Sequence, residues 1–239
     1  MGNSKDKYNL HFRRLEFKYI LPTVLADALV PTVTRYMDLD KHAGEDGHYT
    51  VKSLYFDSPH LLCYQQKLDG IYFRKKYRIR SYEEPKRTFF EIKRKAGDVI
   101  IKDRATLSSN DDLLVQEFES ESLIRGIEDG VFRSELLSDY LNHSLSPKLM
   151  TIYKRKPYVS RFSNNLRLTF DYDLKACFFK NGRIDFKNRS CFIDNSLTVL
   201  EIKFNSKIPS WLGFIIKAHS LERSSFSKYA ASIYKLRQN

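Results

Sequence analysis

Basic side chains alternate with apolar ones inside several stretches that have the composition of β-strands. An extended chain places every second side chain on the same face. In the stretch 74–82, one face carries four basic residues, Arg74, Lys76, Arg78 and Arg80. The stretches 14–19, 89–95 and 200–204 divide in the same way. So much positive charge on one surface is unfavourable unless an anion lies among the side chains. The pattern therefore predicts a pocket for an anion of the polyphosphate type.

The overall charge agrees with this prediction. The 239 residues carry a formal net charge of +12, and 42% of them are apolar, which is enough for a folded core. Such a charge indicates nucleic acid, a membrane surface or a phosphorylated molecule as partner, and charge alone does not choose among them. Cys63, Cys177 and Cys191 lack metal-ligand spacing and indicate a reducing, cytoplasmic setting. No apolar run reaches the roughly 20 residues that span a bilayer, so no membrane segment is expected.

Hydrophobic periodicity predicts an α+β chain in which most strands are antiparallel. Helical spacing occurs over 23–38, 111–143 and 209–236. The segments 71–82 and 87–95 form a predicted hairpin, Asn181-Gly182 is a predicted two-residue turn, and 60–69 fits either a helical turn or a strand. The other predicted strands are 12–21, 49–56, 97–107, 148–159, 166–174, 176–180, 183–187 and 198–205.

The charged faces of these strands have two possible surroundings. A plain amphipathic sheet turns its charged face to water, and for any single strand this is the commoner arrangement. A solvated face usually mixes charge signs, however, whereas these faces are biased toward Lys and Arg. We therefore expect a closed barrel with a cationic lumen, whose apolar outer face is covered by the three helical segments. We expect residues 1–239 to form a single domain of this kind.

Short motifs in a fixed order run from about residue 12 to residue 235. The first is Arg14-x-Glu16-x-Lys18-Tyr19. The later ones are Ser53-x-Tyr55-x-Asp57, Lys76-x-Arg78-x-Arg80, Glu91-x-Lys93, Lys102-x-Arg104, Tyr153-x-Arg155, Arg167-x-Thr169-x-Asp171, Glu201-x-Lys203 and Ser227-Lys228-Tyr229. This series resembles the polyphosphate polymerase domain of the vacuolar transporter chaperone (VTC) family, within the CYTH or triphosphate tunnel metalloenzyme superfamily. The wider superfamily has glutamate where this chain has Arg14, and the arginine is closer to the polymerase branch.

The resemblance implies a tunnel of eight antiparallel strands, with helices packed outside it, a helical insert at about 111–143 and a C-terminal helix. It implies catalytic roles for Arg78, Arg80, Lys93, Arg155 and Arg167. It implies phosphate binding by Lys18, Lys76, Lys102, Ser227 and Lys228. Glu201 would hold a divalent metal, with Mn²⁺ favoured over Mg²⁺. Arginine forks bind phosphate oxygens in pairs and lysines act as point charges, which suits these roles.

The function implied is transfer of the γ-phosphoryl group of ATP to a growing inorganic polyphosphate chain, with release of ADP. ATP and polyphosphate are then the partners, and nucleic acid is not expected because the charges lie within strands. Two alternatives stay open. One is a tunnel-fold triphosphatase that hydrolyses inorganic triphosphate or nucleoside triphosphates. The other is a non-catalytic module that binds polyphosphate or nucleic acid.

Overall fold

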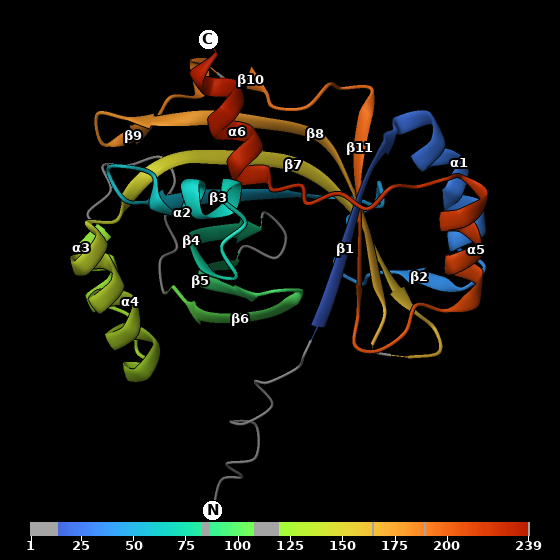
Figure 1. The fold of residues 1–239 in the computed structure, drawn as a ribbon, viewed down its shortest axis with the longest axis horizontal. Coiled ribbons are helices and arrows are strands. Elements are labelled where there is room, and N and C mark those ends of the chain that lie inside the picture. The colour runs from blue at the N-terminus through green and yellow to red at the C-terminus, as the bar shows by residue number, and fades with distance from the viewer. Residues whose placement is uncertain (1–13, 83–86, 108–119, 164, 189, 239) are drawn as a thin grey trace, which may run out of the picture.

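Eight antiparallel strands close into a barrel in the computed structural model, which describes residues 14–82, 87–107, 120–163, 165–188 and 190–238. The strands are β1 (Arg14–Pro22), β3 (Tyr49–Asp57), β4 (Phe73–Tyr82), β5 (Arg87–Ala96), β6 (Val99–Thr106), β7 (Ser146–Ser160), β8 (Arg167–Lys180) and β11 (Leu197–Phe204). Their order around the ring is β8, β11, β1, β6, β5, β4, β3 and β7, and β7 pairs with β8 to close it (Figure 1). The predicted eight-stranded antiparallel barrel is confirmed.

Three short strands extend the sheet outside this ring. β2 (Met37–Leu39) pairs with β7, whereas β9 (Arg183–Ile184) and β10 (Ser190–Cys191) pair with β8. A single turn of 3₁₀ helix, Phe186–Asn188, lies between β9 and β10. These additions leave the ring of eight strands closed.

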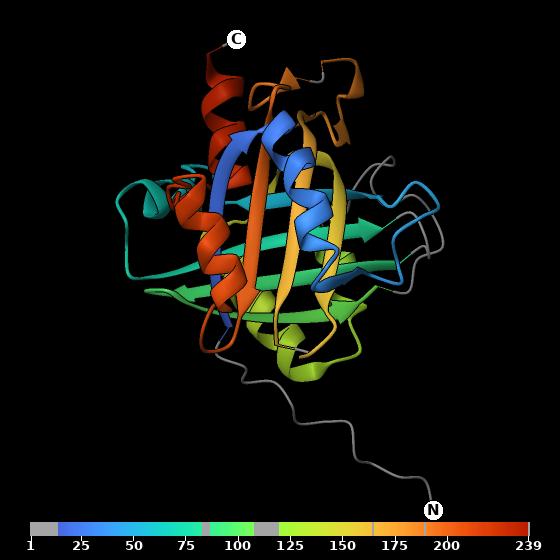
Figure 2. The same cartoon turned by 90° about the vertical axis from the view of Figure 1, so that its right-hand side faces the viewer.

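Helices cover the outside of the barrel. They are α1 (Thr23–Val33), α2 (Leu62–Leu68), α3 (Ser120–Arg125), α4 (Gly130–His143), α5 (Ser210–Ala218) and α6 (Lys228–Arg237). Figure 2 shows α1 and α5 side by side in front of β1, β11 and β8. In Figure 1, α6 crosses β7 and β8, and α3 and α4 lie at the opposite side of the molecule from α1. In the described part of the chain, none of the helices is both long and apolar enough to cross a membrane.

The hydrophobic core lies between the strands and these helices, not inside the barrel. On β4, Tyr77 and Ile79 face outward into a buried apolar cluster, while Arg78 and Arg80 face the lumen. A second cluster, which includes Leu200 of β11, lies beneath α1 and α5. Each fully buried apolar side chain contributes about 1.5–3 kcal/mol to stability. The expected inverted barrel, apolar outside and cationic within, is therefore present.

Several predicted element boundaries were wrong. The helix expected over 23–38 ends at Val33, because residues 37–39 pair with β7 instead. The helix expected over 209–236 is interrupted between α5 and α6, where the backbone N–H of Ser224 donates to the carbonyl oxygen of Lys18. The strand expected over 183–187 ends at Ile184, before the 3₁₀ turn.

One further boundary needs correction, and other predictions of this kind agree with the structure. The strands expected at 166–174 and 176–180 are one strand, β8, which bends at Asp173 with a φ of 51°. The ambiguous segment 60–69 contains α2. The Asn181-Gly182 turn is present, with φ values of 50° and 76°. Residues 12–13, the hairpin turn at 83–86 and residues 111–119 of the expected insert lie outside the described residues, while the rest of that insert contains α3 and α4.

The buried carboxylate of Asp57 ties α2 and α6 to the end of β3. It accepts backbone hydrogen bonds from Ser58, Cys63 and Tyr64, at 2.8, 2.8 and 3.1 Å. It also accepts the hydroxyl of Tyr229 at 2.7 Å. The backbone N–H groups at the start of α2 thereby gain an acceptor, and the start of α6 is fixed next to the barrel.

We expect Asp57→Ala to lower the free energy of unfolding by about 3 kcal/mol, because it leaves several buried donors without an acceptor. Urea unfolding followed by far-UV circular dichroism measures this loss. Asp46→Ala is the matched control, since the Asp46 carboxylate also accepts a backbone N–H, from His48, but at an exposed turn. A loss for Asp57→Ala no larger than that of the control would contradict the anchoring role.

Candidate active site

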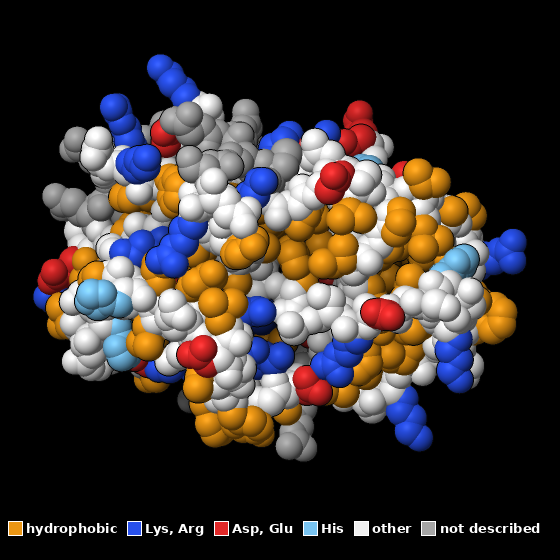
Figure 3. All heavy atoms as spheres, turned by 45° about the horizontal axis from the view of Figure 1, so that its top comes forward, with side chains coloured by type: hydrophobic (Ala, Val, Ile, Leu, Met, Phe, Trp, Pro, Cys, Tyr) orange, Lys and Arg blue, Asp and Glu red, His pale blue; other side chains and the backbone are white. Residues whose placement is uncertain are grey.

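A continuous cavity runs along the barrel lumen. Its larger part, about 410 Å³, lies toward α2 and the start of α6. Its smaller part, about 310 Å³, lies toward the start of β3 and the end of β4. The two parts share lining residues, among them Arg78, Arg80 and Arg155, so they form one passage. Figure 3 shows Lys and Arg side chains gathered in a hollow of the molecular surface.

All eleven residues predicted for the site line this passage. Nine line the larger part: Lys18, Lys76, Arg78, Arg80, Lys93, Arg155, Glu201, Ser227 and Lys228. Lys102 and Arg167 lie at the other end, in the smaller part. The Arg167 side chain there is 40% exposed and forms an ion pair with Asp40, which makes it the most peripheral member of the set. Nine of the eleven come from barrel strands, whereas Ser227 and Lys228 stand at the start of α6.

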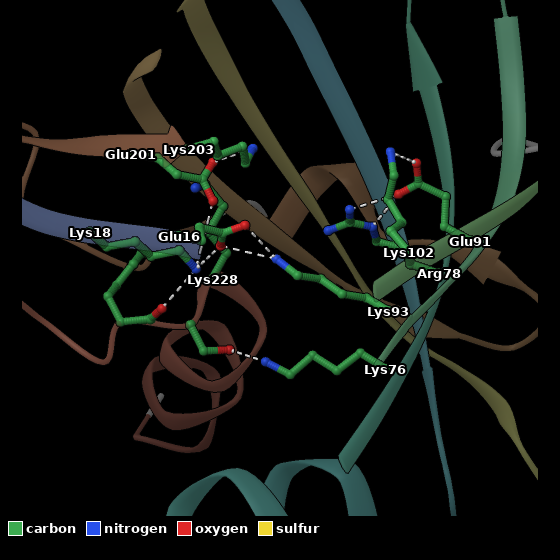
Figure 4. A network of polar contacts seen from close by, with 12 residues as sticks. Glu16, Lys18, Lys76, Arg78, Glu91, Lys93, Lys102, Glu201, Lys203 and Lys228 are labelled. Carbon is green, nitrogen blue, oxygen red and sulfur yellow. Dashed lines mark hydrogen bonds and ion pairs between the residues drawn. The ribbon is translucent and has the colours of Figure 1, made fainter. Parts of the chain in front are cut away.

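Two carboxylates of the lumen come from the adjacent strands β1 and β11. Glu16 accepts hydrogen bonds from Lys93 at 3.0 Å and lies 3.1 Å from the Lys18 nitrogen. Glu201 contacts Lys203 at 3.1 Å and Arg155 at 3.2 Å. Figure 4 shows a convergence of the labelled side chains Glu16, Lys18, Lys93, Glu201 and Lys203.

Neighbouring charges keep both of these carboxylates ionised. Burial alone would raise the pKa of Glu201, but Lys203, a hydrogen bond with Glu16, Lys18 and Arg155 together hold that pKa well below its usual value. Burial and Glu201 would likewise raise the pKa of Glu16, and Lys93 and Lys18 lower it. Both side chains are therefore negatively charged inside the barrel.

Two further carboxylates bind basic side chains from the other strands around the lumen. Glu91 on β5 is fully buried and forms ion pairs with Arg78 at 2.7 Å and with Lys102 at 3.1 Å. These three side chains lie at the right of Figure 4. Asp171 on β8 accepts two hydrogen bonds from the Arg155 guanidinium, at 2.6 and 2.8 Å, and forms an ion pair with Lys228 at 2.6 Å. Each of these carboxylates joins cations from different elements, so they fix the arginine forks in place.

Two of the basic residues predicted for the site, Lys76 and Arg80, lack a carboxylate partner among the described residues. Lys76 donates to the hydroxyl of Ser227 at 2.7 Å. Arg80 donates to the hydroxyls of Ser53 and Tyr153, at 3.2 and 3.3 Å. Burial and the neighbouring Lys18, Lys93 and Arg74 lower the pKa of Lys76 well below its usual value. An anion placed here would relieve that repulsion and stabilise the charged form of Lys76.

The chain before α6 forms part of the lumen wall. Ser227 caps α6, accepting the backbone N–H of Ala230 at 3.3 Å, and this places Lys228 at the start of the helix. The Lys18 side chain donates to the carbonyl oxygen of Phe226 at 3.2 Å. The predicted pair Ser227 and Lys228 is thus held against β1 and β8.

The lumen supplies few ligands of its own for a metal. In the described ranges, no group of three His, Cys, Asp or Glu side chains is arranged to hold an ion. Glu16 and Glu201 are nevertheless diagonal neighbours, since Glu16 lies opposite Lys203 and Glu201 opposite Lys18. One or two carboxylates, completed by phosphate oxygens and water, is the usual coordination of small hard divalent ions. The residues present therefore fit a metal that arrives with a phosphate substrate.

Sequence reasoning missed several lumen residues. Asp171, which holds Arg155 and Lys228, had no assigned role, and Lys203 was considered only as a partner of Glu201. Both share a strand face with a predicted residue, so alternation alone indicated their direction. Tyr153 belongs to one of the motifs but had no assigned role, and Arg80, Arg155 and Lys228 all contact it. No local pattern marks a tyrosine for that role.

We expect Glu91→Gln to lower the free energy of unfolding by about 3 kcal/mol, because the neutral amide leaves buried Arg78 without a counter-ion. The pKa of Glu91 is depressed, since Arg78, Arg80 and Lys102 outweigh its burial. Its contribution is complete above the ordinary carboxyl pKa of 4.5 and is lost as the pH falls toward the depressed value.

Urea titrations at neutral pH and at about pH 3 should therefore show a difference between wild type and variant that shrinks in acid. Glu121→Gln is the matched control, because Glu121 pairs with Arg125 on an exposed helix surface. That change should alter stability by less than about 0.5 kcal/mol. A difference between wild type and Glu91→Gln that stays constant with pH would contradict the ionised role of Glu91.

Comparison with solved structures identifies the same fold in other proteins. A candidate adenylyl cyclase from Hippeastrum, described as having a dominant triphosphatase activity, matches with a TM-score of 0.54 and 15% identity, over 93% of this chain and 96% of that one. A candidate adenylate cyclase from Bacillus halodurans matches with a TM-score of 0.51 and 15% identity, over 90% and 95%. At these identities the likeness concerns the fold alone.

Family comparison is more specific. No curated protein matches the sequence. The model of the VTC domain, however, matches residues 13–237, which is almost the whole chain and includes every residue of the site. The expected resemblance is thereby confirmed, and this chain belongs to the VTC domain family.

Proposed function

We propose that this protein is a metal-dependent polyphosphate polymerase. It would transfer the γ-phosphoryl group of ATP to the end of an inorganic polyphosphate chain and release ADP. Membership of the VTC family and the triphosphate tunnel fold support action on triphosphates. The cationic passage through the barrel supports a long anionic substrate in particular, because a chain can extend along it.

The observation that carries this proposal is the state of the lumen carboxylates. Four come from the barrel strands, Glu16, Glu91, Asp171 and Glu201, and each is bound by lysine or arginine. Asp98, in the turn after β5, also lines the larger part of the cavity and is bound by Arg223. No histidine among the described residues lines either part of the cavity. Water needs a base to become a good nucleophile, whereas the terminal oxygen of a phosphate chain is already anionic. The described lumen thus offers neither an unpaired carboxylate nor an imidazole as base, which favours phosphate over water as the acceptor.

In the proposed reaction, an oxygen of the chain end attacks the γ-phosphorus, and the bond from that phosphorus to the β–γ bridging oxygen breaks. Catalysis of such a transfer depends mainly on positioning and on cations around the equatorial oxygens. Arg78, Arg155 and Lys93 are already held in place by carboxylates, so little ordering remains to be done on binding. Arg80 and Lys76 have no carboxylate partner and would take phosphate oxygens directly. Lys18, Lys102, Arg167 and Lys228 would add positive charge along the chain.

Glu201 would hold the divalent metal, with Glu16 beside it. We expect Mn²⁺ in preference to Mg²⁺, following the family resemblance. When bound, the ion would neutralise part of the charge of the phosphate groups. The two carboxylates already face the lumen and are ionised, which is the form that a metal requires.

A triphosphatase is the second candidate. The Hippeastrum neighbour, described as having a dominant triphosphatase activity, favours it. Both reactions need the same phosphate-binding side chains, and they differ only in the acceptor. Product analysis therefore separates them.

We expect purified protein, incubated with ATP and Mn²⁺, to form ADP and phosphate chains that are resolved as a ladder on a gel. Release of free phosphate in place of chains would show the triphosphatase. If neither product forms but polyphosphate or RNA binds, the non-catalytic alternative holds.

We expect Arg80→Ala to reduce the rate of γ-phosphoryl transfer by at least about a hundredfold, because it removes a preorganised charge from the transition state. Folding should be preserved, since Arg80 is bonded to hydroxyls and its removal strands no carboxylate. Arg125→Ala, which removes an exposed arginine of α3, is the matched control and should leave the rate unchanged. A near-normal rate in folded Arg80→Ala would show that the transferred group is held elsewhere.

A further inference from the structure

The two ends of the passage differ in how their cations are neutralised. At the end near the start of β3, Lys102 is paired with Glu91 and Arg167 with Asp40. Arg104 there lies over the ring of Phe89, at 4.7 Å from its centroid. Positive charge at this end is therefore largely matched by carboxylates.

The opposite end, between α2 and the β5–β6 turn, carries cations without such partners. Lys67 of α2, Arg74 of β4 and Lys95 of β5 line both the larger part of the cavity and an adjoining hollow of about 440 Å³. None of the three forms an ion pair with a carboxylate in the part of the chain that the structure describes. Arg74 donates to the carbonyl oxygen of Ile71 at 2.6 Å. Asp98, the acidic residue of this hollow, is occupied by Arg223 at 2.7 Å.

Burial and neighbouring charge both act on the lysines at this end. Burial, and after it the charge of Arg74, lowers the pKa of both Lys67 and Lys95. An ordinary solvated lysine is not affected in this way. Asp98 opposes this effect at Lys95 in part, but its carboxylate is paired with Arg223. Arg74 therefore repels both lysines, and the three cations form a site for an anion.

The basic residues of this outer end lie in line with the basic residues inside the lumen. Arg74, Lys76, Arg78 and Arg80 lie on one face of β4, spaced two residues apart, so the row is about 20 Å long. That is longer than the three phosphates of a nucleotide need. Lys95 extends the row on the neighbouring strand, since it pairs with Arg74 in the sheet register. The outer cations therefore lie where a chain longer than a triphosphate would leave the lumen.

The wall of this opening has a defined shape. Gly97 in the β5–β6 turn has a φ of 56°, and its backbone N–H donates to the carbonyl oxygen of Tyr72 at 3.3 Å. A Cβ at Gly97 would lie 2.9 Å from the Tyr72 ring, so the ring packs directly on the turn. This contact joins the segment before β4 to the segment after β5 and holds Arg74 and Lys95 next to each other.

We propose that Lys67, Arg74 and Lys95 form an outer phosphate subsite, through which the growing polyphosphate chain leaves the tunnel. This inference rests on the proposed polymerase function. The outer subsite would bind phosphates beyond those held in the lumen. It would therefore favour long chains over triphosphate and keep the product attached between additions.

The test compares two probes, inorganic triphosphate and a long inorganic polyphosphate, by competition against a labelled polyphosphate in fluorescence anisotropy. Wild type should bind the long chain more tightly. The double variant Lys67→Ala/Lys95→Ala should weaken binding of the long chain on the order of tenfold and leave triphosphate binding within about twofold. The salt dependence of long-chain binding should become shallower by about two in log–log slope, one for each charge removed.

The matched control is Lys187→Ala/Lys217→Ala, which removes two exposed lysines that line neither the passage nor the outer hollow. It should change binding of neither probe by more than about twofold. An equal loss for both probes in Lys67→Ala/Lys95→Ala would overturn the outer subsite, as would no loss for either. A loss of long-chain binding in the control of the same size would also overturn it, because net charge would then explain the effect.

The length of the polyphosphate made in the reaction is a second, independent measurement. If wild type makes polyphosphate, the Lys67→Ala/Lys95→Ala variant should make shorter chains with an unchanged KM for ATP. Unchanged chain length would overturn the exit path while leaving the polymerase proposal intact. If wild type makes no polymer, but the difference between the two probes is found, the polymerase proposal fails and the outer anion subsite stands.

Discussion

Repulsion among the basic side chains inside the barrel is the constraint on which the rest of the structure depends. Two like charges 4 Å apart repel by about 4 kcal/mol even at an effective dielectric constant of 20. Four carboxylates, Glu16, Glu91, Asp171 and Glu201, offset this repulsion, and each is shared between at least two cations on different elements. They therefore neutralise charge and also connect strands across the lumen.

A charged interior determines what the outside must be. A strand whose inner face is basic has its apolar side chains on the outer face, as Tyr77 and Ile79 show on β4. Such a barrel exposes hydrophobic surface in water unless other elements cover it. The six described helices do so, and the two apolar clusters lie beneath them. The helices of this fold are therefore required by the chemistry of the lumen.

Sequence alone predicted the parts of the site that depend on alternation. Arg78 and Arg80 differ from Tyr77 and Ile79 only in parity along the strand, and parity decides which face each occupies. The direction of a lumen side chain was thus available from its neighbours. The bias of these faces toward Lys and Arg predicted closure into a barrel, and the family resemblance added the number of strands.

Contacts between distant segments were beyond such reasoning. Lys67 belongs to a helix, and only closure of the barrel brings it beside Lys95. The bond between Asp57 and Tyr229 spans 172 residues of sequence, and nothing local to either residue indicates the other. Residues 37–39 continue a helical pattern but become strand β2, because pairing with β7 outweighs a weak local preference. Which carboxylate pairs with which cation was likewise set by the tertiary structure.

Those pairings divide these lumen cations into two groups with different roles. Arg78, Arg155 and Lys93 are bound to carboxylates, so their positions are fixed before any ligand arrives. Lys76 and Arg80 are bonded to hydroxyls, which neutralise no charge. An incoming phosphate gains most from the second group, because it supplies the missing negative charge, while the first group already faces it with ordered donors. Preorganisation and affinity are thus supplied by different side chains, and the substrate completes a charge balance that the folded protein leaves open.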